Sequence, residues 1–382
     1  MRGILTSAIT SAFDIHHSIF EIRYSVFIEG ERPSVSMKGP EDVPRLVTIG
    51  GRSGPSLIVQ GLRGYGWAVT AIVTTTDSGS SSGVLREQFG IPAPGVIRSV
   101  LAAAANPRPD LKPLADLFEY RLRPAHDPTL RHMALGNLIL AAFSEALGDF
   151  ERAVEAVARL LDCWAVVLPV PSSPATLCAR LADGSVVREE LNVRATGKPP
   201  IVEVFLEPAV VRVPDACSRA IQEADLIVFG PGGLYCSVLP GVLPGPMCQA
   251  VQESRACTVY ICNTTTQPGQ TDGLDSVAHV REMIRYLGEG HLDYVLLNTQ
   301  VPTDDMIAAY RQDEVHFMPV TPEEIRRIKA LGPTPIVGNF VEQDWPGKRA
   351  LHKLDTIRHD PHKVATALQS LLVGSEARSP AA

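Results

Sequence analysis

Long apolar runs, paired cysteines and basic clusters are all missing from this 382-residue sequence. Its clean apolar runs, such as Leu138 to Phe143, are far shorter than the roughly 20 residues that a membrane-spanning helix requires. The seven cysteines include no CxxC pair, so neither a disulfide framework nor a zinc knuckle is indicated. The net charge is −7 and no stretch concentrates Lys and Arg, which argues against broad binding to nucleic acid. We therefore expect a cytoplasmic protein with no membrane span and no nucleic-acid partner.

Three familiar catalytic patterns are also missing or weak. There is no His-Glu-x-x-His zinc pattern, and neither Gly50 nor Gly51 begins the Gly-x-Gly-x-x-Gly spacing of dinucleotide oxidoreductases. The segment Gly79 to Gly83 formally matches the Gly-x-Ser-x-Gly elbow of serine hydrolases, with Ser81 as the nucleophile. That elbow is a sharp turn, however, and here Thr74 to Ser80 separate Ser81 from the preceding strand. The sequence thus disfavours these three enzyme classes.

Two glycine- and hydroxyl-rich loops follow two short apolar segments early in the chain. Leu46 to Ile49 suits a strand buried on both faces, and Gly50 to Gly54 breaks it before Pro55, a residue suited to the first turn of a helix. Val69 to Val73 repeats the strand pattern and is followed by the Ser- and Thr-rich loop from Thr74 to Gly83. Helix N-termini offer free N–H groups to anions, so both loops favour phosphate binding.

Later strands end in the same way. Leu226 to Phe229 precedes a glycine turn at Gly230 to Gly233, and Val259 to Cys262 precedes a polar loop at Asn263 to Gly269. The carboxyl ends of parallel strands meet at one edge of an open α/β sheet, where ligands bind. The four loops together therefore predict a nucleotide or phosphate site.

The chain is expected to be an α/β protein, with a Rossmann-like, mostly parallel sheet covered by helices on both faces. Residues 98–161 are predicted as a helical insertion, and residues 45–373 as a single domain. Val166 to Val170, then Ala175 to Leu181 and Val186 to Val193, are predicted as strands with a hairpin, forming a small antiparallel piece or an edge. Residues 1–44 are expected to be a flexible N-terminal extension or a misassigned start before Met37, and residues 374–382 a disordered tail.

An ordered series of motifs resembles a known family. The motifs are VTIGGRSG, TAIVTTTDSGSSSGVLRE, PAPGVIRSVL, ALGNLILAA, ADLIVFGPGGLYCSVLP and NTTTQPGQTDG. They are similar to those of bacterial gluconeogenesis factors of the YvcK type, which belong with the 2-phospho-L-lactate transferases of the CofD type. The resemblance covers about Arg45 to Leu372. It implies a Rossmann-like core with a helical insertion.

The resemblance also implies a function. Gluconeogenesis factors bind UDP-sugars and act in carbon-source-dependent growth and cell shape, with no established reaction. The alternative is a transferase that moves a phospho-acyl group from a guanosine diphosphate carrier to a deazaflavin with magnesium. We expect a UDP-sugar or another nucleoside diphosphate as ligand, no certain cofactor, and magnesium only if the chain is an enzyme. The sequence leaves a homodimer open.

The site residues that the resemblance implies lie in the loops already described and in one insertion helix. They are Gly50, Gly51, Gly54, Asp77, Gly79, Ser81, Ser82, Gly83, Asn137, Gly230, Gly232, Tyr235, Asn263, Gln267 and Asp272. Arg52 and Ser53 in the first loop, and Arg98, complete the predicted binding set. No catalytic residue is assigned. Asp77 is the one candidate magnesium ligand.

This sequence departs from the usual family pattern at several positions. Arg52 stands where a third glycine is usual, Ser78 where a second acid follows Asp77, and Val96 where an Asp is usual. Met133 stands in place of a His, with His132 one position earlier. Each lost acid removes an oxygen ligand for magnesium. The departures therefore weaken the prediction of metal-assisted transfer more than that of binding.

Several of these residues have a structural explanation as well as a functional one. Asp77 is either a helix cap or a ligand for a sugar hydroxyl or magnesium. Arg52 either pairs with a diphosphate or lies exposed over the turn, while Tyr235 either stacks on the ligand or is a buried ring with a bonded hydroxyl. His279 is predicted as a surface or interface residue on a helix, and Asn298 as a ligand contact or a turn cap.

Overall fold

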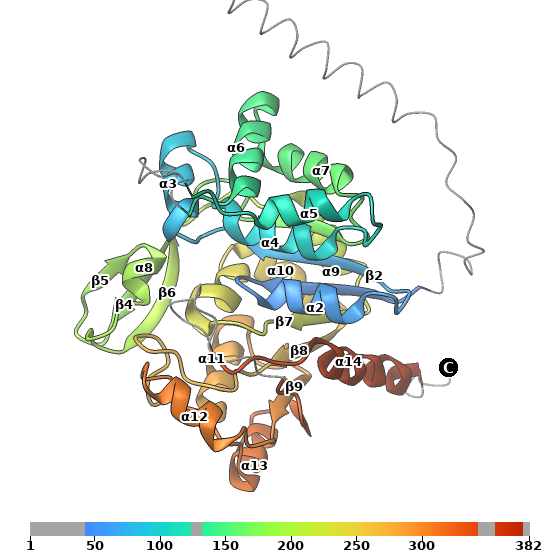
Figure 1. The fold of residues 1–382 in the computed structure, drawn as a ribbon. Helices are drawn as coiled ribbons and strands as arrows, with labels where there is room; N and C mark the ends of the chain where they lie inside the picture. The colour runs from blue at the N-terminus through green and yellow to red at the C-terminus, as the bar shows by residue number, and fades with distance from the viewer. Residues whose placement is uncertain (1–42, 124–131, 343–355, 377–382) are drawn as a thin grey trace, which may run out of the picture. The chain divides into compact units, whose positions relative to one another are not determined.

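The computed structural model describes residues 43–123, 132–342 and 356–376. The predictions for residues 1–42 and for the tail from residue 377 onward lie outside these ranges. Within them, a seven-stranded sheet has the order β10-β9-β8-β7-β1-β2-β3, and all of its strand pairs are parallel (Figure 1). The strands are β1 (Arg45–Gly50), β2 (Ala68–Thr74), β3 (Val166–Val170), β7 (Leu226–Phe229), β8 (Cys257–Ile261), β9 (Tyr294–Asn298) and β10 (Thr334–Gly338).

Both faces of this sheet are buried, as the short apolar segments predict. In β1, Leu46 packs into one hydrophobic core, while its neighbours Val47 and Ile49 pack into another. In β2, Val69 and Val73 face the first core and Ile72 faces the second. Successive side chains of a strand point to opposite faces, so an unbroken apolar run requires cover on both sides.

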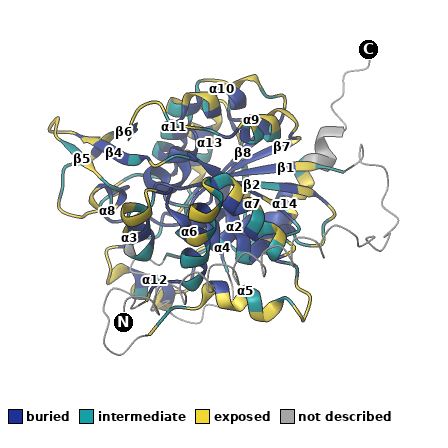
Figure 2. Ribbon diagram, turned by 90° about the horizontal axis from the view of Figure 1, so that it is seen from above, coloured by how far each residue is buried: buried dark blue, intermediate teal, exposed yellow. Residues whose placement is uncertain are grey.

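Helices supply that cover (Figure 2). The first core takes apolar residues from α2 (Gly54–Leu62), α4 (Pro94–Ala104), α5 (Lys112–Glu119), α6 (Leu135–Leu147), α7 (Phe150–Leu160) and α14 (Pro361–Glu376). The second takes them from α9 (Asp215–Gln222), α10 (Gly245–Glu253), α11 (Ser276–Leu287) and α13 (Pro322–Ala330). The first core also takes Leu85 from α3 (Ser80–Phe89). The second also takes residues from α8 (Glu190–Val193), a π-helical turn (Leu234–Val238) and a 3₁₀ turn (Leu239–Gly241), while α12 (Asp304–Arg311) packs into a third, smaller cluster. The Rossmann-like α/β prediction is therefore confirmed.

A separate three-stranded antiparallel sheet has the order β5-β4-β6. Its strands are β4 (Thr176–Leu181), β5 (Val186–Arg188) and β6 (Ile201–Glu207). The predicted strand from Val186 to Val193 is wrong after Arg188, because Glu189 has a positive φ of 74° and Glu190 begins α8. Val166 to Val170 instead forms β3, the edge of the parallel sheet next to β2.

Other predictions differ from the structure in detail. His279 is predicted as a surface or interface residue, but it is fully buried in α11, and its Nδ1 lies 2.9 Å from the Asp275 carbonyl oxygen. The helix α14 extends to Glu376, beyond the predicted boundary at residue 373. The helices α4 to α7 fill the predicted insertion between β2 and β3. In the described part of the chain, every helix is too short or too polar to cross a bilayer.

Candidate nucleotide-binding site

The direction of the strand order reverses between β1 and β7, and the loops that follow these two strands are in contact. Gly230 N donates to the Ile49 carbonyl at 3.0 Å. A Cβ on Gly54 would overlap the carbonyl oxygen of Pro231, so only glycine allows this approach. Ligands of open α/β sheets bind in the crevice at such a reversal. The structure thus brings Gly50 to Gly54 together with Gly230 to Gly232, as predicted.

A cavity of about 290 Å³ opens beside this loop pair, at the N-terminus of α2. Ser53, Gly232, Asn263 and Gln267, all predicted site residues, line it. The segment from Thr356 to Pro361, next to the start of α14, forms a further wall. The cavity therefore joins three of the four predicted loops.

Uncharged polar groups with unmet hydrogen-bonding capacity line this cavity, beside the charged residues Glu342 and Arg358. Four lining residues carry a buried side-chain atom with no hydrogen-bond partner among the described residues, namely Ser56 Oγ, Asn263 Oδ1, Gln267 Oε1 and His359 Nε2. Burial lowers the pKa of His359 to about 4, so this imidazole is neutral at physiological pH. Buried polar groups in proteins are nearly always hydrogen-bonded. These four atoms are suited to a ligand with complementary donors and acceptors.

Asp77 belongs to a second group, which does not line the cavity. Arg52 Nη2 lies 3.2 Å from Glu190 Oε1, and Arg194 Nη1 lies 3.0 and 3.2 Å from the two carboxylate oxygens of Glu190. Asp77 shares a side-chain hydrogen bond with Glu190, and its Oδ1 accepts from Gly79 N at 2.9 Å. The loops after β1 and β2 therefore meet α8 through a cluster of two acids and two arginines.

The two acids of this cluster titrate differently. Burial, and then the negative charge of Glu190, raise the pKa of Asp77 to about 6. Burial also acts to raise the pKa of Glu190, but the guanidinium groups of Arg52 and Arg194 outweigh it and lower that pKa. In mildly acidic solution Asp77 is therefore protonated and can donate a hydrogen bond to Glu190, which stays ionised.

These residues do not fit a magnesium ion. Magnesium prefers near-octahedral oxygen coordination, and here Arg52 and Arg194 occupy the Glu190 carboxylate. Val96 is 8% exposed within the first core, and Ser78 Oγ accepts from Leu191 N at 3.2 Å. Across residues 43–123, 132–342 and 356–376, no group of three or more His, Cys, Asp or Glu side chains could hold a metal.

The hydroxyl-rich loop and the insertion meet at Asn137, as the predicted site requires. Asn137 Nδ2 donates to Ser81 Oγ at 2.9 Å, while its Oδ1 is buried with no partner in the described structure. Gly83 and Gly79 lie in the same turn, where Gly83 N donates to the Gly79 carbonyl at 3.2 Å. Ser82 Oγ lies where a Cβ on Gly95 would be, so this loop packs tightly on α4.

The structure gives other predicted site residues structural contacts. Arg98 is buried, with Nη1 2.5 Å from Glu119 Oε2, and so it joins α4 to α5. Tyr235 is 3% exposed in the second core, and burial raises the pKa of its hydroxyl. Asp272 Oδ2 accepts from Gly269 N at 2.7 Å. Asn298 Oδ1 accepts from Phe340 N at 3.0 Å, and its Nδ2 donates to the Gln300 carbonyl at 2.8 Å, which is the turn-cap alternative.

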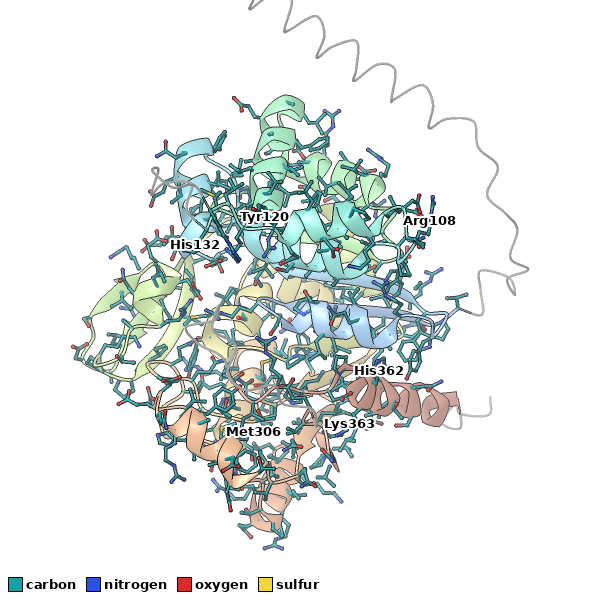
Figure 3. The ribbon with its side chains drawn as sticks, in the orientation of Figure 1. Arg108, Tyr120, His132, Met306, His362 and Lys363 are labelled. Atoms are coloured by element: carbon teal, nitrogen blue, oxygen red, sulfur yellow. The ribbon has the colours of Figure 1, made fainter. Side chains whose placement is uncertain are left out.

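His132 and Met133 differ in their exposure. Met133 is buried in the first core, whereas His132 is exposed and has a positive φ of 66°. Figure 3 labels His132 together with Tyr120 from the segment that pairs with it; His132 N donates to the Leu122 carbonyl at 2.8 Å. The polar side chain in this segment is therefore that of His132, one position before the place where the family usually has a His.

Comparisons with known proteins identify the family of this chain. The profile of the family described as 2-phospho-L-lactate transferase CofD matches residues 46–341. The chain belongs to the CofD family. Within it, the chain groups with gluconeogenesis factors: it is 38% identical over 330 residues to the gluconeogenesis factor of Bacillus subtilis (strain 168), covering 86% of this chain and 98% of the relative.

A second relative and a solved structure are also similar to this chain over most of its length. The gluconeogenesis factor of Halalkalibacterium halodurans is 36% identical over 324 residues, covering 85% of this chain and 95% of the relative. The crystal structure of a UPF0052-family protein from Bacillus halodurans superposes with a TM-score of 0.78 at 34% identity, covering 87% of this CofD-family chain and all of that chain.

Sequence reasoning missed Glu190, Arg194, Ser56 and His359. The spacing of Glu190 and Arg194, four residues apart, is the pattern of an ion pair on a helix, but Glu190 lies within the predicted strand from Val186 to Val193. His359 lies far along the chain from the loops that it joins, and no local pattern marks it.

Proposed function

We propose that this CofD-family protein is a gluconeogenesis factor that binds a nucleoside diphosphate sugar, with a UDP-sugar as the expected ligand. Its role would be regulatory, in growth and cell shape on gluconeogenic carbon sources. The observation that carries this proposal is the position of the glycine loop between two groups of polar residues. Ser53 lines the cavity, while Arg52, its neighbour in sequence, contacts Glu190 in the cluster that includes Asp77.

Each part of such a ligand has a suitable partner. The diphosphate would lie on the Gly50 to Gly54 loop, at the N-terminus of α2, where the helix dipole favours anions. The base would enter the cavity, where Asn263 and Gln267 offer amide groups. The sugar would extend toward Asp77 and Asn137, whose side chains suit hydroxyl groups.

The alternative is a 2-phospho-L-lactate transferase-like enzyme, which the family profile also supports. In that case the same loop would hold a guanosine diphosphate carrier, and a deazaflavin would be the acceptor. Because the acids around Asp77 do not fit magnesium, we favour binding without transfer.

Thermal shift with three nucleotides tests the proposal. We expect UDP-N-acetylglucosamine to stabilise the protein more than GDP or NAD does. A ligand at 100 times its dissociation constant adds roughly 2.7 kcal/mol to the free energy of unfolding. An equal or larger shift with GDP would overturn the uridine assignment, and no shift with any nucleotide would overturn nucleotide binding.

A matched pair of variants locates the ligand. Gln267→Leu removes a buried amide oxygen that has no partner among the described residues, so we expect the melting temperature without ligand to change little and the ligand-induced shift to disappear. Gln249→Leu, on the exposed face of α10, should leave the ligand-induced shift intact. Loss of the shift in both variants would mean that the effect is not local to the cavity.

A further inference from the structure

Arg52 has an unusual backbone conformation at the centre of the glycine loop. Its φ is 54°, a left-handed conformation that favours glycine and costs other residues energy. We propose, on the basis of the function proposed above, that the ligand's diphosphate binds without a divalent cation. In this exchange the Arg52 side chain leaves Glu190 and binds the diphosphate, while Arg194 stays paired with Glu190. The positive charge that a metal ion would otherwise supply would then come from the Arg52 side chain of the glycine loop.

The ion pairs of Glu190 make this exchange feasible. Arg52 makes one contact with Glu190, at 3.2 Å, and its side chain is 34% exposed. Arg194 contacts both carboxylate oxygens, so Glu190, with a side chain only 3% exposed, keeps a partner when Arg52 leaves. Removing the last partner of a buried charge is strongly destabilising, and the second arginine avoids that cost.

The short helix α8 and the residue before it also contact the hydroxyl-rich loop and α3. Leu191 N donates to Ser78 Oγ at 3.2 Å. Arg86 of α3 lies 3.3 Å from Glu189, the residue before α8. These contacts involve neither Arg52 nor Glu190. The position of α8 therefore does not depend on the Arg52 ion pair.

A guanidinium group is well suited to replace the metal here. Its planar set of donors forms paired hydrogen bonds with phosphate oxygens, and its charge is present at every physiological pH. A magnesium ion held between Asp77 and Glu190 would have to compete with the two arginines for the Glu190 oxygens. The cluster therefore favours arginine over metal as the counter-charge of the diphosphate.

Binding measured with and without metal tests the inference. By calorimetry with UDP-N-acetylglucosamine, we expect the wild type to bind equally well in EDTA and in magnesium chloride. Arg52→Gly, which suits the left-handed backbone, should fold but bind at least about tenfold more weakly in EDTA, the scale of one charge-assisted hydrogen bond. Glu314→Gly, an exposed site with a φ of 59°, makes the same backbone change elsewhere and should bind normally.

The possible results distinguish a failure of metal-free binding from a failure of nucleotide binding itself. Binding by the wild type only in magnesium would overturn the inference and leave nucleotide binding intact, as would unchanged affinity in Arg52→Gly. No binding by the wild type in either buffer would overturn both. Glu190→Gln gives a second measurement: it removes the competitor for Arg52, so we expect tighter binding, and weaker binding by a variant that melts normally would contradict the exchange.

Discussion

At the scale of single residues, Asp77 lies between a ligand role and a structural one. Its Oδ1 accepts from Gly79 N, the N-cap residue of α3, but α3 has no side-chain cap hydrogen bond, and the other neighbour of Asp77 is the Glu190 carboxylate. The helix-cap alternative is therefore wrong, and the ligand role stays a prediction. Placing a carboxyl group beside another acid costs stability once both are ionised.

Asp77 should make the stability of the protein depend on pH. Burial and Glu190 raise its pKa from 3.8 to about 6, so between these values the folded protein holds a proton that the unfolded chain has lost. The free energy of unfolding should consequently fall as pH rises through this window. Asp77→Asn removes the contribution, so its stability relative to the wild type should increase from pH 4 to pH 7.

Urea unfolding of both proteins across this pH range is the measurement. Asp272→Asn, at an exposed carboxyl in the loop after β8, controls for the loss of one surface charge. A stability difference between Asp77→Asn and the wild type that does not change with pH would show that Asp77 titrates as an ordinary carboxyl.

At the scale of elements, the contact between the β1 and β7 loops defines the crevice. Gly54, the first residue of α2, approaches Pro231 so closely that any side chain would meet its carbonyl oxygen. The same approach sets the position of the α2 N-terminus, where the diphosphate is proposed to bind. The spacing of the two loops and the proposed binding of the diphosphate therefore both depend on Gly54.

Gly54→Ala should lower both stability and affinity. Overpacking of this kind typically costs about 1–3 kcal/mol, and displacement of the loop should also reduce the UDP-N-acetylglucosamine-induced thermal shift. Gly245→Ala is the matched control, because a Cβ there has no atom within 4 Å and Gly245 likewise begins a helix. Equal melting temperatures and equal ligand shifts for both variants would contradict the close approach.

The elements that sequence reasoning located have strong local patterns. Leu226 to Phe229 and Val166 to Val170 were predicted as strands with the bounds that the structure shows, because a short apolar run is distinctive. The helix α8 was missed because four residues cannot establish a period. The strand β10 was missed because it is an edge strand, partly exposed and with Pro335 inside it.

The site residues, too, were predictable only where a local sequence pattern marks them. The glycines after β1 and β7 were predictable, since sharp turns at strand ends leave a local mark. The Arg52–Glu190 contact was not, because Glu190 begins the short helix α8 and lies 138 residues further along the chain. Contacts of that range depend on the tertiary fold, which no short pattern contains.

At the scale of the whole molecule, the CofD-family fold is shared with transferases, but shared folds support different chemistry. We expect no 2-phospho-L-lactate transfer by this protein, because the candidate acids do not fit magnesium and arginine supplies charge without the geometric activation of a hard cation. The assay contains the guanosine diphosphate donor, deazaflavin and magnesium, with an active transferase of the family as positive control. Measurable turnover would replace the binder interpretation with the enzyme.

The strand order has a consequence for how the chain folds. Arg45 N donates to Asp225 Oδ2 across 180 residues, and β1 pairs with β7 along its length. During synthesis β1 can pair with β2 early, but its other edge stays open until residues 226–229 emerge from the ribosome. An open edge of a buried strand invites pairing with another chain. A nascent chain that stalls before β7 would therefore be prone to aggregate, and the ligand crevice can form only after both strands have joined.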